Sequence, residues 1–250
     1  MSDRPIGQET FSPAIGKAAA YQRWIFDLIK PAIGSRLLEI GVGSVPFSRL
    51  YPPLISWYPA DIDSTMVAEA VQIGSDRLPS TQILGIVGDA GTSEFWNKVR
   101  AHHQPDSIIA VNVMEHILDD VGFLKNAFDV LPEDGSGRMA LFVPALPSIY
   151  GSMDASAGHY RRYRKNGLAS LATSVGFEIE SLQYVNAPGI LYWWWRGKVR
   201  KTTDLTDPML LDSISRIDRY AVPLIRMVED RISPPIGQSL VIRLRKKSRV

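Results

Sequence analysis

The chain has 250 residues, a length that suits one large domain or a domain with an insertion. Its net charge is only +2, so the overall charge gives no reason to expect nucleic-acid binding. Cysteine is absent, which excludes disulfides, thiolate metal ligands and cysteine nucleophiles and is typical of a cytoplasmic protein. No apolar run approaches the roughly 20 residues that a membrane-spanning helix needs.

The N-terminal segment, residues 12–33, reads as an amphipathic helix over 14–29. Apolar residues recur in it at helical spacing, and a proline and a glycine follow to end it. The pattern predicts a helix that packs on a sheet.

The central stretch is RLLEIGVGSV, residues 36–45. Its apolar run predicts a buried parallel strand, interrupted near its end by Glu39. Gly41 and Gly43 then allow a tight turn and a close approach of the backbone to a ligand. Strand, glycine turn and helix start are how an α/β domain opens a nucleotide-like site. A dinucleotide fingerprint would need a third small residue three positions after Gly43, where Pro46 stands instead.

This E-x-G-x-G stretch resembles the first motif of the class I S-adenosylmethionine (SAM) dependent methyltransferases, with Val45 in the place of the family's third glycine. The next predicted strand, 55–63, contains Asp61, which lies 18 residues after Gly43. That spacing is near the roughly 20 residues expected for a carboxylate that binds the ribose hydroxyls. Asp63 is the more natural cap of the following helix.

A third predicted strand, 83–87, leads into Gly88, Asp89 and Ala90. The resemblance implies that Asp89 accepts a hydrogen bond from the adenine amino group, and that Ile62 and Ala90 enclose the ring. The alternative is that Asp89 caps the helix predicted over 93–102.

The fourth predicted strand, 105–113, is followed by Glu115 and His116, and its string VNVMEHILDD resembles the family's V-L-E-H-I region. With a fifth strand at 138–144, the resemblance covers about residues 34–176. It implies a seven-stranded, Rossmann-like doubly wound α/β sheet. It also implies SAM as cofactor and S-adenosylhomocysteine (SAH) as product. The cofactor-binding residues that it implies include Glu39, Gly41, Gly43, Asn112 and Val113.

Methyl transfer requires the acceptor to lose a proton, and Glu115, His116 and His159 are the candidate groups, with histidine favoured. Some family members bind a divalent metal through an E-H pair at this place. No further acid nearby in the sequence completes such a set, so no metal is expected.

His159 belongs to YGSMDASAGHYRRY, residues 150–163, a segment similar to one in a subgroup of bacterial class I methyltransferases. We expect His159 to be the base or to orient the acceptor. The acceptor pocket is expected to include Tyr160, Arg161 and Tyr163, since arginines can clamp an anionic acceptor. A solvated lid is the alternative. The resemblance also implies that the N-terminal helix caps the crevice, where Tyr21 or Trp24 could line it.

The last two strands are predicted over 177–184 and 238–245, the second of them antiparallel. The core is then residues 34–184 and 237–246, with a helical insertion at 186–236. Trp193–Trp195 lie in the insertion beside Arg196 and Lys198. Three interpretations stay open: a substrate lid, core packing, or contact with a membrane interface.

The sequence as a whole predicts a single SAM-dependent methyltransferase domain over 1–250. It is expected to act on a heteroatom or carboxylate of a small-molecule or lipid-linked metabolite in the cytoplasm. A peripheral membrane contact and a homodimer stay open. The alternatives are an NAD-type oxidoreductase and a catalytically inactive SAM-binding partner subunit. Nucleic acid is not expected as a substrate, because no N-P-P-Y-like motif for an extruded base is present.

Overall fold

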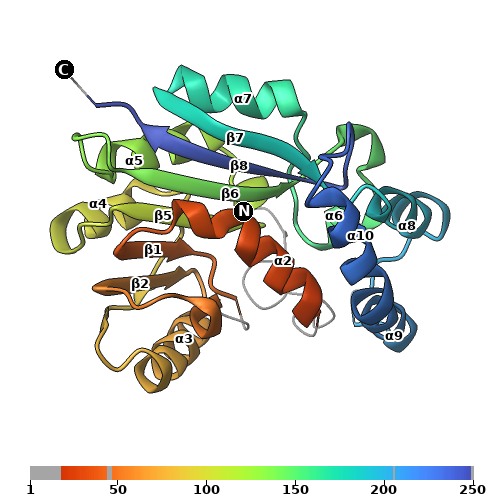
Figure 1. The fold of residues 1–250 in the computed structure, drawn as a ribbon, viewed down its shortest axis with the longest axis horizontal. Coiled ribbons are helices and arrows are strands. Elements are labelled where there is room, and N and C mark those ends of the chain that lie inside the picture. The colour runs from red at the N-terminus through yellow and green to blue at the C-terminus, as the bar shows by residue number, and fades with distance from the viewer. Residues whose placement is uncertain (1–17, 44–46, 205, 249–250) are drawn as a thin grey trace.

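The computed structural model describes residues 18–43, 47–204 and 206–248, which form a mixed sheet with helices on both faces (Figure 1). Part of the predicted N-terminal helix and Pro46 lie outside the described residues. The strands are β1 (Arg36–Ile40), β2 (Ser56–Asp61), β3 (Gln82–Ile83), β4 (Ile86–Val87), β5 (Ser107–Val111), β6 (Arg138–Pro144), β7 (Phe177–Val185) and β8 (Ser239–Lys246).

The strand order is β3-β2-β1-β5-β6-β8-β7, with β4 also paired to β2. β8 runs antiparallel to both of its neighbours, and the other pairs are parallel. The predicted doubly wound sheet is therefore confirmed. It has eight strands where seven were expected, because Leu84 and Gly85 divide the third predicted strand into β3 and β4.

The chain leaves β1 toward β2 on one side and leaves β5 toward β6 on the other. This reversal of direction opens a crevice at the carboxyl ends of β1 and β5, the place where doubly wound sheets bind ligands.

Helices cover the two faces of the sheet and bury alternate residues of each strand. On one face, Leu37 and Trp57 pack with α2 (Ala19–Ile29), α3 (Ser64–Arg77) and α10 (Val222–Glu229). On the other, Leu38 and Tyr58 pack with α4 (Ser93–His102), α5 (Asp120–Val130) and α7 (Lys165–Ser174). Because both faces are covered, the central strands are apolar almost throughout.

The insertion between β7 and β8 carries α8 (Gly189–Trp194), α9 (Pro208–Arg216) and α10, at the right of Figure 1. Wider π-helical turns at Trp195–Val199 and Ile217–Ala221 follow α8 and α9. Asp218 in the second turn accepts hydrogen bonds from the backbone N–H groups of Ala20 at 3.1 Å and Tyr21 at 2.8 Å. The insertion is thereby attached to the first turn of α2.

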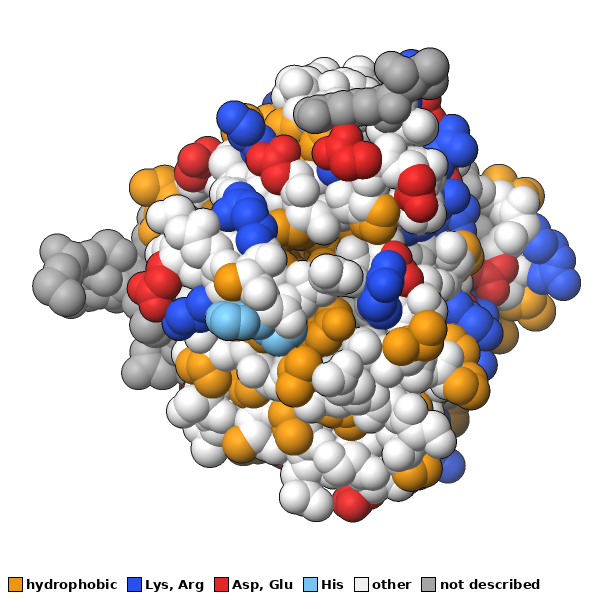
Figure 2. All heavy atoms as spheres, turned by 90° about the vertical axis from the view of Figure 1, so that its left-hand side faces the viewer, with side chains coloured by type: hydrophobic (Ala, Val, Ile, Leu, Met, Phe, Trp, Pro, Cys, Tyr) orange, Lys and Arg blue, Asp and Glu red, His pale blue; other side chains and the backbone are white. Residues whose placement is uncertain are grey.

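The face shown in Figure 2 carries acidic and basic side chains interspersed with hydrophobic ones. Of the helices in the described part of the chain, none combines the length and apolarity that a bilayer span requires.

Candidate functional site

A cavity of about 680 Å³ opens at the carboxyl ends of the parallel strands. Residues of β1, β2 and β5 and the loops after them form its floor, while α2 and the insertion form its walls. Its volume lies within the range of about 300–1,000 Å³ typical of small-molecule sites.

The glycine turn after β1 lies on the cavity floor. Gly41 has φ +76°, and a Cβ atom built there would lie 2.3 Å from Cγ2 of Val113. The backbone N–H of Gly41 donates to the carbonyl of Ala60 at 2.8 Å, so the turn is fixed to β2. Gly41, Gly43 and Val113 all line the cavity. A side chain at position 41 would therefore need both a strained backbone and a displaced neighbour.

Asp61, the last residue of β2, also faces the cavity. Its carboxylate accepts backbone hydrogen bonds from Gly43 at 3.2 Å and Asp63 at 3.0 Å. Burial raises the pKa of Asp61 from its ordinary value. Asp63 accepts from the N–H of Thr65 at 2.8 Å, which confirms it as the cap of α3. Ile62 between them is 40% exposed and lines the same space.

Asp89, Ala90 and Asn112 line the cavity beyond Asp61. Asp89 accepts from the N–H of Gly91 at 2.7 Å and does not cap α4, whose N-cap is Thr92. Asn112 has φ +53°, a left-handed conformation that asparagine adopts more readily than most residues.

Glu39 does not reach the cavity, although the resemblance placed it among the cofactor-binding residues. It is 3% exposed and accepts a hydrogen bond from Nε1 of Trp57 at 3.0 Å. Burial raises its pKa to about 7, against the effect of hydrogen bonds from Trp57 and from the backbone of Phe47. Glu39 therefore holds Trp57 and the segment that begins at Phe47 from behind the cavity.

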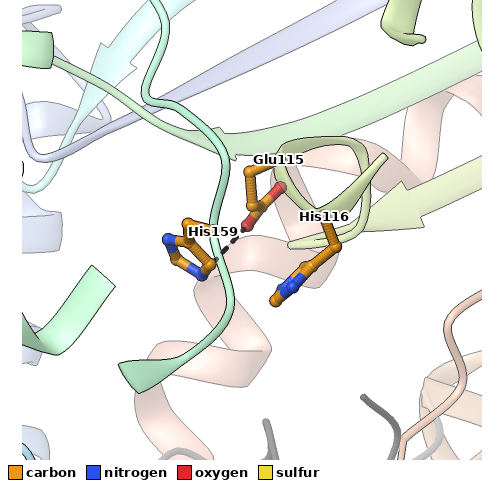
Figure 3. Close-up of side chains that lie close together, drawn as sticks. All are labelled: Glu115, His116 and His159. Atoms are coloured by element: carbon orange, nitrogen blue, oxygen red, sulfur yellow. Dashed lines mark ion pairs between the residues drawn. The ribbon is translucent and has the colours of Figure 1, made fainter. Parts of the chain in front are cut away.

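Glu115, His116 and His159 lie together at the other end of the cavity (Figure 3). Their donor atoms lie within 4.8 Å of one another, and Nε2 of His159 is 3.9 Å from a carboxylate oxygen of Glu115. The two imidazole rings meet edge to face, with centroids 4.7 Å apart. Burial raises the pKa of Glu115 to about 7 and lowers that of His116 to about 3. His116 and His159 line the cavity, and Glu115 is completely buried behind them.

Asp154 is a buried residue whose carboxylate contacts several side chains and orients His159. Its carboxylate lies 3.2 Å from Nδ1 of His159 and accepts from Nε of Arg162 at 2.7 Å. It also accepts from Nε1 of Trp193 at 3.0 Å and from the backbone N–H of Gly151 at 2.9 Å. Burial opposes its ionisation, yet these donors hold the pKa of Asp154 below its ordinary value. Asp154 thus connects α6 (Ser152–Ser156), the G-H-Y-R-R-Y string and the insertion.

Some of the residues expected in the acceptor pocket line the cavity, namely Tyr21 and Tyr160. Three others do not. Trp24 is 2% exposed and donates to Asp230 at 3.1 Å. Arg161 pairs with Asp120 at 2.7 Å and donates to the carbonyl of Leu118.

Tyr163 is 4% exposed, and its hydroxyl lies 3.2 Å from the carbonyl of Met114. Tyr160 and Arg162 line the cavity whereas Arg161 and Tyr163 do not, so alternate side chains of residues 160–163 face it. The two arginines therefore have separate structural partners and do not form a shared clamp.

The three consecutive tryptophans of the insertion have different environments. Trp193 lines the cavity, as the lid interpretation expects. Trp194 is 45% exposed and Trp195 is 38% exposed, and Arg200 lies over the Trp195 ring at 4.9 Å from its centroid.

Several lining residues were not predicted, including Arg162, Asn186, Tyr192 and Asp218. Asn186 at φ +60° begins the insertion, and a lone asparagine after a strand gives no signal of this in the sequence. Asp154 was missed as well. The signal that could have found it is its position five residues before His159 in a segment expected to overlie the crevice.

No protein-family model matches the sequence, and a search of the curated proteins finds no match. Many solved structures are similar to the chain in fold. An SAM-dependent methyltransferase from Mesorhizobium loti has a TM-score of 0.59 at 13% identity, over 91% of this chain and 100% of that one. Phosphoethanolamine N-methyltransferase 2 from Haemonchus contortus, in complex with SAM, has a TM-score of 0.57 at 13% identity, over 94% of this chain and 56% of that one.

The [4+2]-cyclase SpnF is also similar, with a TM-score of 0.56 at 15% identity, over 90% of this chain and 81% of that one. These likenesses concern the fold, because the identities are low. With the strand order and the glycine turn, they lead to one conclusion: the chain has the fold of the class I SAM-dependent methyltransferases.

Proposed function

We propose that the protein transfers a methyl group from SAM to an oxygen or nitrogen atom of a small-molecule or lipid-linked acceptor. The observation that carries this proposal is the continuous cavity that joins the strand ends of the sheet to His116 and His159, with Glu115 buried behind them. The residues at the strand ends are suited to bind the nucleoside part of SAM. The side chains at the opposite end of the cavity can remove a proton from an acceptor.

At the cofactor end, Gly41 and Gly43 line the cavity with backbone alone, which leaves room beside them for the amino-acid part of SAM. The Asp61 carboxylate accepts from the ribose hydroxyls, and Asp89 accepts from the adenine amino group. Ile62 and Ala90 pack on the ring, while Asn112 and Val113 complete the floor.

Bound SAM would supply a methyl group to a lone pair of the acceptor in line with the sulfur, with the electrons of the broken S–C bond remaining on sulfur. Glu115, His116 or His159 would take up the proton that the acceptor loses. Apolar residues of the insertion, Ile214, Ile217, Val222 and Ile225, line the cavity. Such a wall favours alignment and keeps water from a reaction whose charge disperses.

The alternatives differ in which ligand they require. An NAD-type oxidoreductase would bind a nicotinamide nucleotide in place of SAM. An inactive partner subunit would bind SAM without turning it over. The similar fold of a [4+2]-cyclase is a reason to measure cofactor binding and methyl transfer separately.

Calorimetric titration with SAH tests the cofactor. The wild type is expected to bind it, and Asp61→Ala is expected to bind it roughly 10–100-fold more weakly, because hydrogen bonds to a charged group contribute about 1.5–3 kcal/mol. Asp63→Ala is the matched control, since this neighbouring carboxylate caps α3 and does not line the cavity. No binding of SAH to the wild type would refute the proposal, and NADH would be titrated next.

A further inference from the structure

We propose that Glu115, His116 and His159 form a binding site for one divalent transition-metal cation. The site lies at the acceptor end of the cavity. The sequence predicts no metal here, because no acid nearby in it completes a set of ligands. The third donor, His159, comes instead from 43 residues after His116 in the chain.

The arrangement of the three side chains is close to that of metal ligands. Their donor atoms lie within 4.8 Å of one another, and Glu115 and His159 approach to 3.9 Å. In a tetrahedral site, ligand atoms about 2.0–2.2 Å from the ion lie about 3.3–3.6 Å from each other. Small side-chain rotations would bring the three donors to that separation. In Figure 3 the carboxylate points toward the space between the two rings.

The Glu115 carboxylate is an independent sign of a cation. It has 0% exposure, and neither oxygen accepts a hydrogen bond from another residue in the described part of the chain. Burying an ionised group without hydrogen bonds is costly, so buried charges in proteins are paired or coordinate metals. A cation between the three side chains would neutralise this carboxylate.

Both histidines are also held as metal-binding histidines usually are. Such residues use one ring nitrogen for the metal and the other to donate to a carboxylate or backbone carbonyl. His159 lies with Nδ1 3.2 Å from Asp154, which leaves Nε2 facing Glu115. His116 makes a hydrogen bond to the backbone of Gly158.

The donor set selects the class of cation. Two imidazole nitrogens and one carboxylate oxygen suit Zn²⁺, Co²⁺, Fe²⁺ or Mn²⁺ better than Mg²⁺ or Ca²⁺, which prefer oxygen ligands. Three protein ligands leave coordination positions open, as catalytic metal sites do. His116 and His159 line the cavity, so a hydroxyl or carboxylate oxygen of a bound molecule could occupy such a position. That this molecule is the methyl acceptor rests on the proposed function.

Co²⁺ titration of the full-length chain tests the site, after metal has been removed with a chelator. Calorimetry and visible absorption are expected to show one Co²⁺ per chain, displaced by Zn²⁺. Glu115→Gln and His159→Ala are each expected to weaken binding at least tenfold. Asp154→Asn should weaken it about 10–100-fold by releasing the His159 ring. His102→Ala, which changes an exposed histidine at the end of α4, serves as the control and should bind as the wild type does.

Absence of stoichiometric Co²⁺ binding by the wild type overturns the proposal, as does equal affinity in Glu115→Gln. If Glu115→Gln does not fold, His159→Gln takes its place in the same comparison. SAH affinity, measured on the metal-free protein, reports folding of each variant and keeps the two proposals apart. A wild type that binds Co²⁺ but not SAH would refute the proposed function and leave the metal site standing.

Discussion

Glu39 is a buried acid whose ionisation opposes folding. It ionises near pH 4.5 in the unfolded chain and at about 7 in the folded protein, mainly because burial raises its pKa. Between these values unfolding releases a proton, so rising pH favours the unfolded chain. We expect Glu39 to lower the free energy of unfolding by about 3 kcal/mol from pH 4.5 to pH 7, with no further change above that range.

Glu39→Gln is expected to remove this pH dependence, because the amide oxygen can still accept from Trp57 and carries no charge. Urea unfolding of wild type and variant from pH 4.5 to pH 8 is the measurement. Glu69→Gln, on an exposed position of α3, should retain the wild-type profile. Parallel profiles for Glu39→Gln and wild type would show that Glu39 ionises normally in the folded state.

Gly41 is required by its backbone conformation as well as by space. Its φ is +76°, and the Cβ atom of an alanine there would lie 2.3 Å from Cγ2 of Val113, so Gly41→Ala meets two penalties at once. A left-handed alanine costs about 1–2 kcal/mol, and the contact adds to this. We expect Gly41→Ala to lower the free energy of unfolding by at least about 2 kcal/mol and to abolish SAH binding.

Gly167→Ala provides the contrast for this glycine. Gly167 lies in the first turn of α7, where an added Cβ atom has its nearest neighbour at 3.9 Å. We expect a gain of about 0.5 kcal/mol in stability and unchanged SAH binding. Urea unfolding measures the stability of the two variants, and calorimetry measures their SAH binding. Equal effects of Gly41→Ala and Gly167→Ala would show that the conformation and the close contact at Gly41 do not require a glycine.

At the scale of elements, Asp218 joins the insertion to α2. Its carboxylate accepts two N–H groups in the first turn of α2, a capping role supplied from about 200 residues away in the chain. Loss of a helix cap costs about 0.5–2 kcal/mol. Asp218→Ala is therefore expected to lower stability by that amount and to speed amide exchange in α2. Asp212→Ala, which breaks an exposed ion pair with Arg216, should change stability by less than about 0.5 kcal/mol.

Asp63 and Asp218 both cap helices, but only the cap made by Asp63 could be predicted from the sequence. Asp63 caps the helix that follows it directly, so a local pattern predicted it. Asp218 caps a helix near the other end of the chain, and Asp154 holds Trp193 from 39 residues away. The strands and the glycine turn follow from short-range patterns of apolar residues and glycine, whereas these contacts depend on tertiary packing.

The same limit applies to Tyr160, Arg161 and Arg162. Composition identified the segment as polar, and its position after the fifth strand placed it over the crevice. The local conformation of residues 160–163, which composition does not reveal, decides which side chains face the cavity. A displacement by one residue exchanges the two arginines.

Peripheral membrane contact through Trp194 and Trp195 stays a prediction, which co-sedimentation with anionic vesicles would test.

At the scale of the whole molecule, the cavity depends on parts that are far apart in the chain. α2 contributes Tyr21 and Ile25, the loops after β1, β2 and β5 contribute the floor, and α10 contributes Val222 and Ile225. A ligand in this cavity binds the assembled protein and not its locally opened forms, so it must suppress every opening that separates these walls.

Hydrogen exchange with and without SAH measures that coupling. At a concentration of 100 times the dissociation constant, a ligand stabilises the assembled form by about 2.7 kcal/mol, which slows exchange through site-breaking openings about 100-fold. We expect this slowing in α2 and α10, and little change in α7 for amides that exchange by local fraying. Slowing restricted to the loops after β1 and β2 would mean that SAH touches only the floor, leaving α2 and the insertion to contact the acceptor alone.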